Sequence, residues 1–98
     1  MITRIVKLEI ALEHCDEFEA VFSKHQTSIQ GQIGCHSTEL KLDTSSPGRY
    51  FTYSIWDSQE DLDNYRKSAL FGVIWPTVKK WFSGKPEAWS LTNIKTDL

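Results

Sequence analysis

The chain lacks the cysteine patterns, leader segments and long apolar runs that would place it in an oxidising compartment or a membrane. Its 98 residues include two cysteines, Cys15 and Cys35, too few for a disulfide framework and without metal-site spacing. The first residues alternate polar and apolar side chains, unlike a signal peptide, and no apolar run approaches the ~20 residues that span a bilayer. These absences predict one cytoplasmic domain over residues 1–98.

Strong charge of one sign is also missing, as are the usual phosphate-binding and metal-binding patterns. The formal net charge is −2 and the lysines are scattered, so no basic stripe is available for nucleic acid. The run Gly31-Gln32-Ile33-Gly34 follows a predicted helix and no helix begins after it, which argues against a phosphate loop. No cluster of His, Asp and Glu has metal-ligand spacing. We therefore expect neither a nucleic-acid partner nor a metal.

Aromatic residues, by contrast, are abundant and concentrated in one part of the chain. Ten of the twelve lie between Tyr50 and Trp89, including all four tryptophans. In a domain this small, such a segment indicates an oversized core, a dimer interface or a ligand pocket.

Hydrophobic periodicity divides the first half of the chain into a strand, a helix and a hairpin. Residues 2–12 alternate with a period of two, and residues 14–30 carry apolar side chains at helical spacings. Strands are predicted at 33–43 and 49–56, because the turn-forming residues 44–48 join two alternating segments.

The second half is predicted to contain an interrupted helix and a last strand. Asp57 or Ser58 caps the helix, and Ser58 with Asp61 approximates a capping box. Pro76 would clash with the carbonyl of Gly72, so we expect a kink or break between these two residues and further helix through Phe82. Residues 87–96 form the last predicted strand.

This β-α-β-β-α-β order predicts an α+β, ferredoxin-like fold. Two split βαβ units give a four-stranded antiparallel sheet with both helices on one face. The opposite face would then be bare, and in the first strand it carries the apolar residues Ile5 and Ala11. A partly apolar face is usually covered, and we expect a second copy of the chain to cover it in a homodimer.

The strand-to-helix segment resembles the antibiotic biosynthesis monooxygenase superfamily, whose ferredoxin-like domains dimerise into an α+β barrel. The resemblance rests on the aromatic strand Tyr50–Trp56 and on the residues that follow it, namely Asp57, Ser58, Leu62, Tyr65, Ser68 and Phe71. The superfamily includes cofactor-free oxygenases of anthrones and quinols, haem-degrading enzymes and small isomerases. The resemblance implies the fold and the dimer more strongly than any one reaction.

The haem-degrading branch can be compared residue by residue with this chain. Its strand asparagine falls at Val6, its helical aromatic at Tyr65 and its histidine ligand at Trp75, and only the aromatic matches. An indole nitrogen is a donor only and cannot ligate iron. We therefore expect no cofactor, and predict that Val6, Tyr65, Phe71 and Trp75 contact a planar substrate, unless the three aromatic residues form a packed core.

Three residues are candidates for proton transfer or anion stabilisation, each with a structural alternative. His36 shares a predicted face with Thr38 and belongs to the residue type that most often serves as a general base, but a hydrogen-bonded structural histidine is the favoured interpretation. Arg4 is expected at an exposed strand edge; pointing inward, it would stabilise an enolate or phenolate. Tyr53 and Tyr50 lie on opposite faces of their strand, and the pattern does not show which one faces the helices.

The resulting functional hypothesis is a cofactor-independent monooxygenase of a small aromatic or polyketide-like substrate, such as an anthrone or quinol. Deprotonation makes such substrates electron-rich, and molecular oxygen then reacts with them directly. The alternatives are a non-catalytic ligand-binding or dimerisation module and, with less support, a small-molecule isomerase in which His36 and a cation converge on one cavity.

Overall fold

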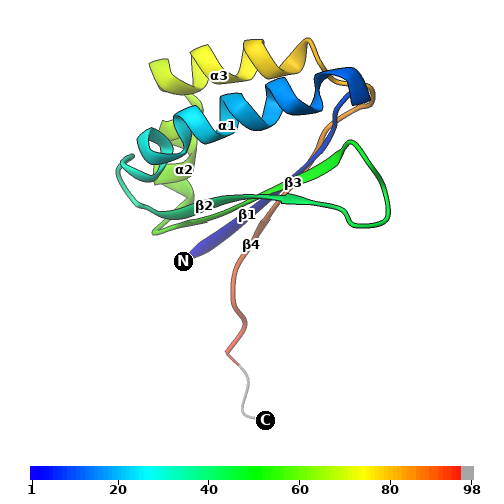
Figure 1. Ribbon diagram of the computed structural model, residues 1–98. Helices are drawn as coiled ribbons and strands as arrows, with labels where there is room; N and C mark the ends of the chain where they lie inside the picture. The colour runs from blue at the N-terminus through cyan, green and yellow to red at the C-terminus, as the bar shows by residue number, and fades with distance from the viewer. Residues whose placement is uncertain (96–98) are drawn as a thin grey trace.

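The computed structural model describes residues 1–95 and consists of one antiparallel sheet with helices on one of its faces (Figure 1). The predicted α+β, ferredoxin-like fold is confirmed, and the strand order in the sheet is β2-β3-β1-β4. The elements in chain order are β1 (Ile2–Glu9), the short 3-10 helix η1 (Leu12–His14), α1 (Cys15–Gln30), β2 (Cys35–Leu42), β3 (Arg49–Trp56), α2 (Gln59–Arg66), α3 (Ala69–Lys79) and β4 (Glu87–Leu91).

The two central strands set the register that divides the sheet into a covered and an open face. Val6 of β1 pairs with Thr52 of β3 and with Ala88 of β4. Successive side chains in a strand point to opposite faces, so Val6 faces the helices and its neighbour Ile5 faces away. All three helices lie over the Val6 face, and the Ile5 face is left uncovered (Figure 1).

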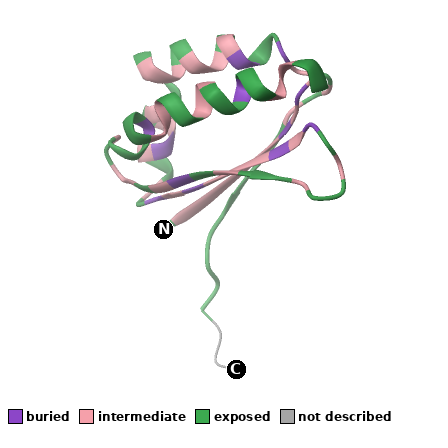
Figure 2. Ribbon diagram, in the orientation of Figure 1, coloured by how far each residue is buried: buried purple, intermediate pink, exposed green. Residues whose placement is uncertain are grey.

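The hydrophobic core lies between α1, α3 and the covered face of the sheet (Figure 2). The ring centroids of Phe18 in α1 and Tyr50 in β3 are 4.8 Å apart, and both side chains are buried. The Tyr50 hydroxyl donates a hydrogen bond to the Glu19 carboxylate, which satisfies the polar end of the ring. The other buried members of this cluster are Leu8, Ile10, Val78 and Trp81.

The interruption of the helical segment was predicted at the wrong place. The chain breaks at Lys67–Ser68, and the Ser68 hydroxyl caps α3 by accepting a hydrogen bond from the Phe71 amide at 3.2 Å. Pro76 lies inside α3. Pro76 and Gly72 are both exposed, so water can bind the Gly72 carbonyl that the proline leaves without a helical partner. The Ser58 cap of α2 is confirmed: its hydroxyl accepts from the Asp61 amide at 3.2 Å.

The first and last strands are shorter than predicted, because each ends where its partner ends. β1 stops at Glu9, and Leu12 lies in η1 with an exposed side chain instead of on the buried face. β4 pairs only with β1, and its last residue, Leu91, lies opposite Thr3 near the start of β1. Residues 92–95 therefore have no strand to join, and position 96 lies outside the described residues.

The helices of residues 1–95 are surface helices of ordinary length. α1, the longest, has 16 residues and exposes most of its polar side chains. Within these residues, no helix combines the length and the apolar character that a membrane span requires.

Candidate functional site

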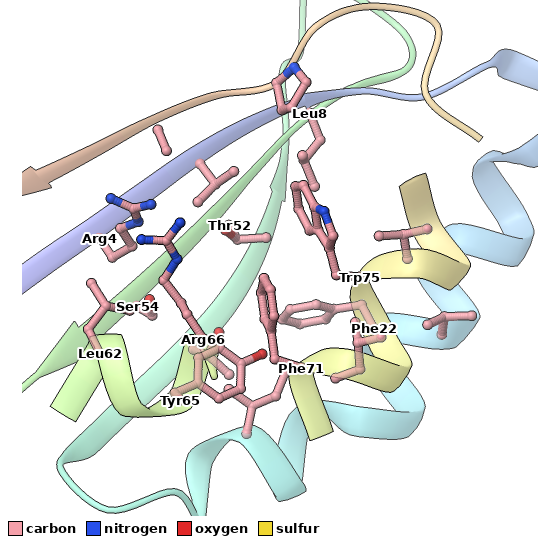
Figure 3. A pocket seen from close by; sticks show the side chains of 18 of the residues that line it. Arg4, Leu8, Phe22, Thr52, Ser54, Leu62, Tyr65, Arg66, Phe71 and Trp75 are labelled. Carbon is pink, nitrogen blue, oxygen red and sulfur yellow. The ribbon is translucent and has the colours of Figure 1, made fainter. Parts of the chain in front are cut away.

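A cavity of about 370 Å³ lies between the covered face of the sheet and the helices (Figure 3). Its volume falls in the range of small-molecule binding sites, roughly 300–1,000 Å³. Side chains of β1 and β3 form its floor, among them Arg4, Val6, Thr52 and Ser54. Side chains of the helices form the opposite wall, among them Phe22, Leu62, Tyr65, Arg66, Phe71 and Trp75.

The helical wall of the cavity is a continuous series of aromatic contacts. Tyr65 stacks on Trp56 of β3 with ring centroids 5.2 Å apart, and meets the Phe71 ring edge-on at 5.4 Å. Phe71 and Trp75 are four residues apart on α3, so they lie on one side of the helix, and their rings stack at 5.6 Å. Trp75 in turn contacts Phe82 at 5.4 Å. This wall presents flat apolar surface to the cavity.

The structure brings together all four residues predicted to contact a substrate. Val6, Tyr65, Phe71 and Trp75 line the same cavity. Arg4 lines it as well, and the expectation of an exposed edge position is wrong for this residue. Because Arg4 and Val6 are two residues apart on β1, both point to the covered face. Their roles in binding or chemistry stay predictions.

His36 does not line the cavity, because β2 contains a bulge. Cys35 pairs with Trp56 and Ser37 with Ile55, so His36 is an extra residue without a partner in β3. The prediction that His36 shares a face with Thr38 is therefore wrong: Thr38 is buried beside the cavity, whereas His36 is exposed. The His36 imidazole lies 2.5 Å from the Asp57 carboxylate, at the surface.

Tyr53 also lies away from the cavity. It pairs with Ile5 of β1 and Glu39 of β2, which places its side chain on the open face of the sheet. Tyr50, three residues earlier on β3, is the tyrosine that packs toward the helices. The sheet thus separates the Tyr53 hydroxyl from the cavity.

Arg66 is a charged cavity residue that was not predicted from the sequence. It occupies the last turn of α2, and Figure 3 shows its guanidinium group beside that of Arg4. The signal was present in the sequence: Arg66 follows the buried Leu62 by four residues and shares its side of the helix. The hydroxyl-bearing floor residues Thr52 and Ser54 were missed too, since nothing in the pattern fixed the face of that strand.

Burial and neighbouring charge change the acid–base properties of the cavity residues. Burial lowers the pKa of Arg4, and the positive charge of Arg66 lowers it further, while Asp63 raises it. Burial raises the pKa of Tyr65 to about 12, with a smaller contribution from the nearby Cys35 thiol. The Tyr65 phenol therefore stays protonated at neutral pH and can donate a hydrogen bond.

The cavity offers several hydrogen-bond donors but no unpaired base. Among the described residues that line it, the only carboxylate is that of Glu87, which forms an ion pair with Lys7 at 3.0 Å. Within residues 1–95, no group of three or more His, Cys, Asp and Glu side chains is positioned to hold a metal. The arrangement suits an apolar, planar ligand with negative charge at one end.

The raised pKa of Tyr65 predicts a loss of stability in alkaline solution. The folded state favours the neutral phenol, which therefore contributes to the free energy of unfolding. This contribution is fully present below pH 10 and is lost as the pH rises through about 12. Tyr65→Phe removes the titration. The difference in free energy of unfolding between wild type and Tyr65→Phe should be constant below pH 10 and change above it, as measured by denaturant unfolding at stepped pH. A difference that does not vary with pH would contradict the assignment.

Comparison with solved structures gives the same fold over nearly the whole chain. A protein from Nitrosomonas europaea, described as a candidate antibiotic biosynthesis monooxygenase, superposes with a TM-score of 0.88 at 14% identity, over 97% of this chain and 100% of its own. One from Bordetella bronchiseptica, described in the same terms, has a TM-score of 0.85 at 21% identity, over 96% and 97%. An antibiotic biosynthesis monooxygenase structure reaches 0.90 at 16% identity, over 97% and 100%.

The sequence comparisons identify the family. No curated protein matches the chain. The family model for antibiotic biosynthesis monooxygenases matches residues 1–75, which include β1, the hairpin of β2 and β3, α2 and most of the aromatic wall. The chain therefore belongs to the antibiotic biosynthesis monooxygenase family.

Proposed function

We propose that the protein is a cofactor-independent monooxygenase that oxidises a small aromatic or polyketide-like substrate, such as an anthrone or quinol. The observation that carries the proposal is the cavity itself: one side is a wall of stacked aromatic rings, and one end holds two guanidinium groups. Family membership supports the oxygenase class. The cavity geometry supports a planar substrate that becomes an anion during the reaction.

The proposed chemistry needs only a bound carbanion or phenolate and molecular oxygen. An anthrone loses a proton from its central methylene group to solvent before the site closes over it, and the resulting anion transfers an electron to oxygen. Recombination of the substrate radical with superoxide gives a peroxide anion on that carbon, which takes up a proton to become a hydroperoxide. Loss of water then leaves a quinone, so one oxygen atom enters the product and the other departs as water with the two methylene hydrogens. Exclusion of bulk water protects the anion.

The cavity residues have separate roles in this proposal. Phe71 and Trp75 hold the aromatic rings of the substrate, and Val6 forms part of the floor. The protonated Tyr65 donates a hydrogen bond to the oxygen anion of the deprotonated substrate, and the positive charge of Arg4 stabilises that anion from the end of the cavity without direct contact. Both effects lower the substrate's pKa and favour its ionisation. The proposal does not use His36 or Tyr53, because both lie outside the cavity.

The lack of an unpaired base in the cavity favours a second candidate function, a non-catalytic ligand-binding module. Such a protein would bind the same planar ligands through the same aromatic wall without oxidising them. The isomerase alternative has less support, since it required His36 to converge with a cation on one cavity, and His36 is at the surface beside Asp57.

Oxygen consumption separates the oxygenase from the binding module. With a panel of anthrones and quinols, wild type should consume oxygen faster than the uncatalysed reaction. Trp75→Ala should lower kcat/KM roughly tenfold or more, because it removes a ring that stacks on the substrate. Val73→Ala, an exposed position on the same helix, is the matched control and should keep wild-type activity. Binding of the panel without oxygen uptake above background would favour the binding module.

We also propose that the open sheet face is the interface of a homodimer. Its central row holds Tyr53, Ile5 and Trp89 side by side across three strands, and Trp89 is 42% exposed. Ile55 and Leu91 extend the apolar area in the next row through their common neighbour Thr3. A second copy of the chain would cover this face, because a C2 axis lets one patch bind itself.

A charge at the centre of this face should separate the two copies. Ile5→Lys would bury an unpaired cation in the interface, so sedimentation velocity should show a dimer for wild type and a monomer for the variant. Val73→Lys places the same charge on an exposed apolar residue of α3 and should stay dimeric. A monomeric wild type, or a dimer that Ile5→Lys leaves intact, would rule out this interface.

A further inference from the structure

We infer that the natural substrate carries a carboxylate, and that Arg4 and Arg66 together bind it at one end of the cavity. This inference rests on the proposed function in one respect, that the cavity is the substrate site. It goes further by naming a permanently charged group on the substrate, distinct from the oxygen anion formed during the reaction. It also assigns a binding role to Arg66.

Among residues 1–95, no carboxylate forms an ion pair with Arg4 or Arg66, and Asp63 acts on Arg4 only as a nearby negative charge that raises its pKa. The chain has three arginines, and the third, Arg49, pairs with Glu9 at 2.7 Å and with Asp43 at 3.6 Å. Arg4 is half-buried and Arg66 is exposed, so water solvates both in part, and an anion held between them would replace that water and offset their mutual repulsion.

The arginines reach the same end of the cavity from different elements. Arg4 extends from β1, and its Nη1 donates a hydrogen bond to the Ser90 hydroxyl of β4 at 3.0 Å, which fixes its direction. Arg66 extends from the last turn of α2. Figure 3 shows both guanidinium groups at the end near Ser54, with Trp75 toward the other end. The pKa of Arg4 is lowered first by burial and then by the positive charge of Arg66, while Asp63 opposes the shift; the contribution of Arg66 is consistent with this proximity.

The position of Arg66 at the end of a helix does not by itself explain why its side chain lies beside Arg4. A helix C-terminus favours a cation, and that would place Arg66 in α2 whatever its direction. Lys67 follows it immediately, is also exposed, and does not line the cavity. The helix end therefore accepts a cation that points to solvent, whereas Arg66 lines the cavity beside a like charge.

The chemistry of the two ends together selects the ligand class. Guanidinium groups are planar forks that match the two oxygens of a carboxylate. Phe71 and Trp75 present flat apolar surface that a small inorganic anion would leave uncovered. A planar aromatic acid uses both ends, so we assign the substrate to aromatic or polyketide-like carboxylic acids.

The carboxylate assignment can be tested without turnover, by measuring the binding of two stable ligands that resemble a quinone product and differ only in charge. Isothermal titration calorimetry would compare anthraquinone-2-carboxylate with the neutral anthraquinone-2-carboxamide. Wild type should bind the acid at least tenfold more tightly than the amide. Arg66→Gln and Arg4→Gln should weaken acid binding at least tenfold and leave amide binding within about twofold. Lys67→Gln removes the same charge outside the cavity and should bind both ligands like wild type.

The outcomes distinguish the inference from the proposed function. Equal affinity of wild type for acid and amide, both weakened by Trp75→Ala, would keep the cavity as the site and overturn the carboxylate assignment. Equal losses in Lys67→Gln and Arg66→Gln, or displacement of the acid by inorganic phosphate at similar concentration, would overturn it too. If neither ligand binds, or if Trp75→Ala leaves both affinities unchanged, the proposed function is contradicted together with the carboxylate assignment. Arg66→Lys keeps the positive charge but loses the planar guanidinium group. If this variant retains part of the acid binding, misfolding is not the reason that Arg66→Gln loses it.

Discussion

The break between α2 and α3 is the feature on which the cavity depends. In one continuous helix, Tyr65 and Phe71, six residues apart, would point about 120° away from each other. They could not then form one wall. The chain instead ends α2 at Arg66 and starts α3 with the Ser68 cap, and the two rings meet at 5.4 Å. The hydrogen bond from the Phe71 amide to Ser68 thus links local capping to the aromatic wall.

The same break determines where charge meets apolar surface. Since α2 ends at the cavity, the last turn of the helix brings Arg66 to the side chain of Arg4 on the sheet. Tyr65, one residue earlier, contributes a phenol held neutral by burial. The cavity is therefore apolar along its length and rich in donors at one end. Such an arrangement favours an anion formed from a flat molecule over the neutral molecule, as the proposed oxygenation requires.

Much of the fold could be predicted because its signals are periodic. A periodic pattern does not depend on any single residue. The alternation in residues 2–12 and the helical spacing in residues 14–30 therefore predicted the element order and the open sheet face. Val6, Tyr65, Phe71 and Trp75 were instead singled out through the resemblance to the superfamily, because Val6, Tyr65 and Trp75 fall at the positions of its haem-binding residues and Phe71 belongs to the strand-to-helix segment that carries the resemblance. Strand lengths were less predictable, because a strand ends where its partner ends, and that is a property of the pair.

The failures come from single residues that change direction without a strong sequence signal. A bulge of one residue at His36 moves this histidine from the covered face to solvent, and nothing in the alternation announces it. Pro76 is a strong sequence signal for a helix break, yet the helix is interrupted at Ser68, where the sequence signal is weaker. Arg66 was not singled out from the sequence: its spacing from Leu62 indicates the side of the helix, but its convergence with Arg4 depends on tertiary packing.

The most direct test of the account is a crystal structure of the protein with a bound aromatic acid such as anthraquinone-2-carboxylate. We expect the ring system against Phe71 and Trp75, with the carboxylate between the guanidinium groups of Arg4 and Arg66. Ligand density elsewhere on the protein, or a Trp75 side chain that fills the cavity in place of the ligand, would contradict it.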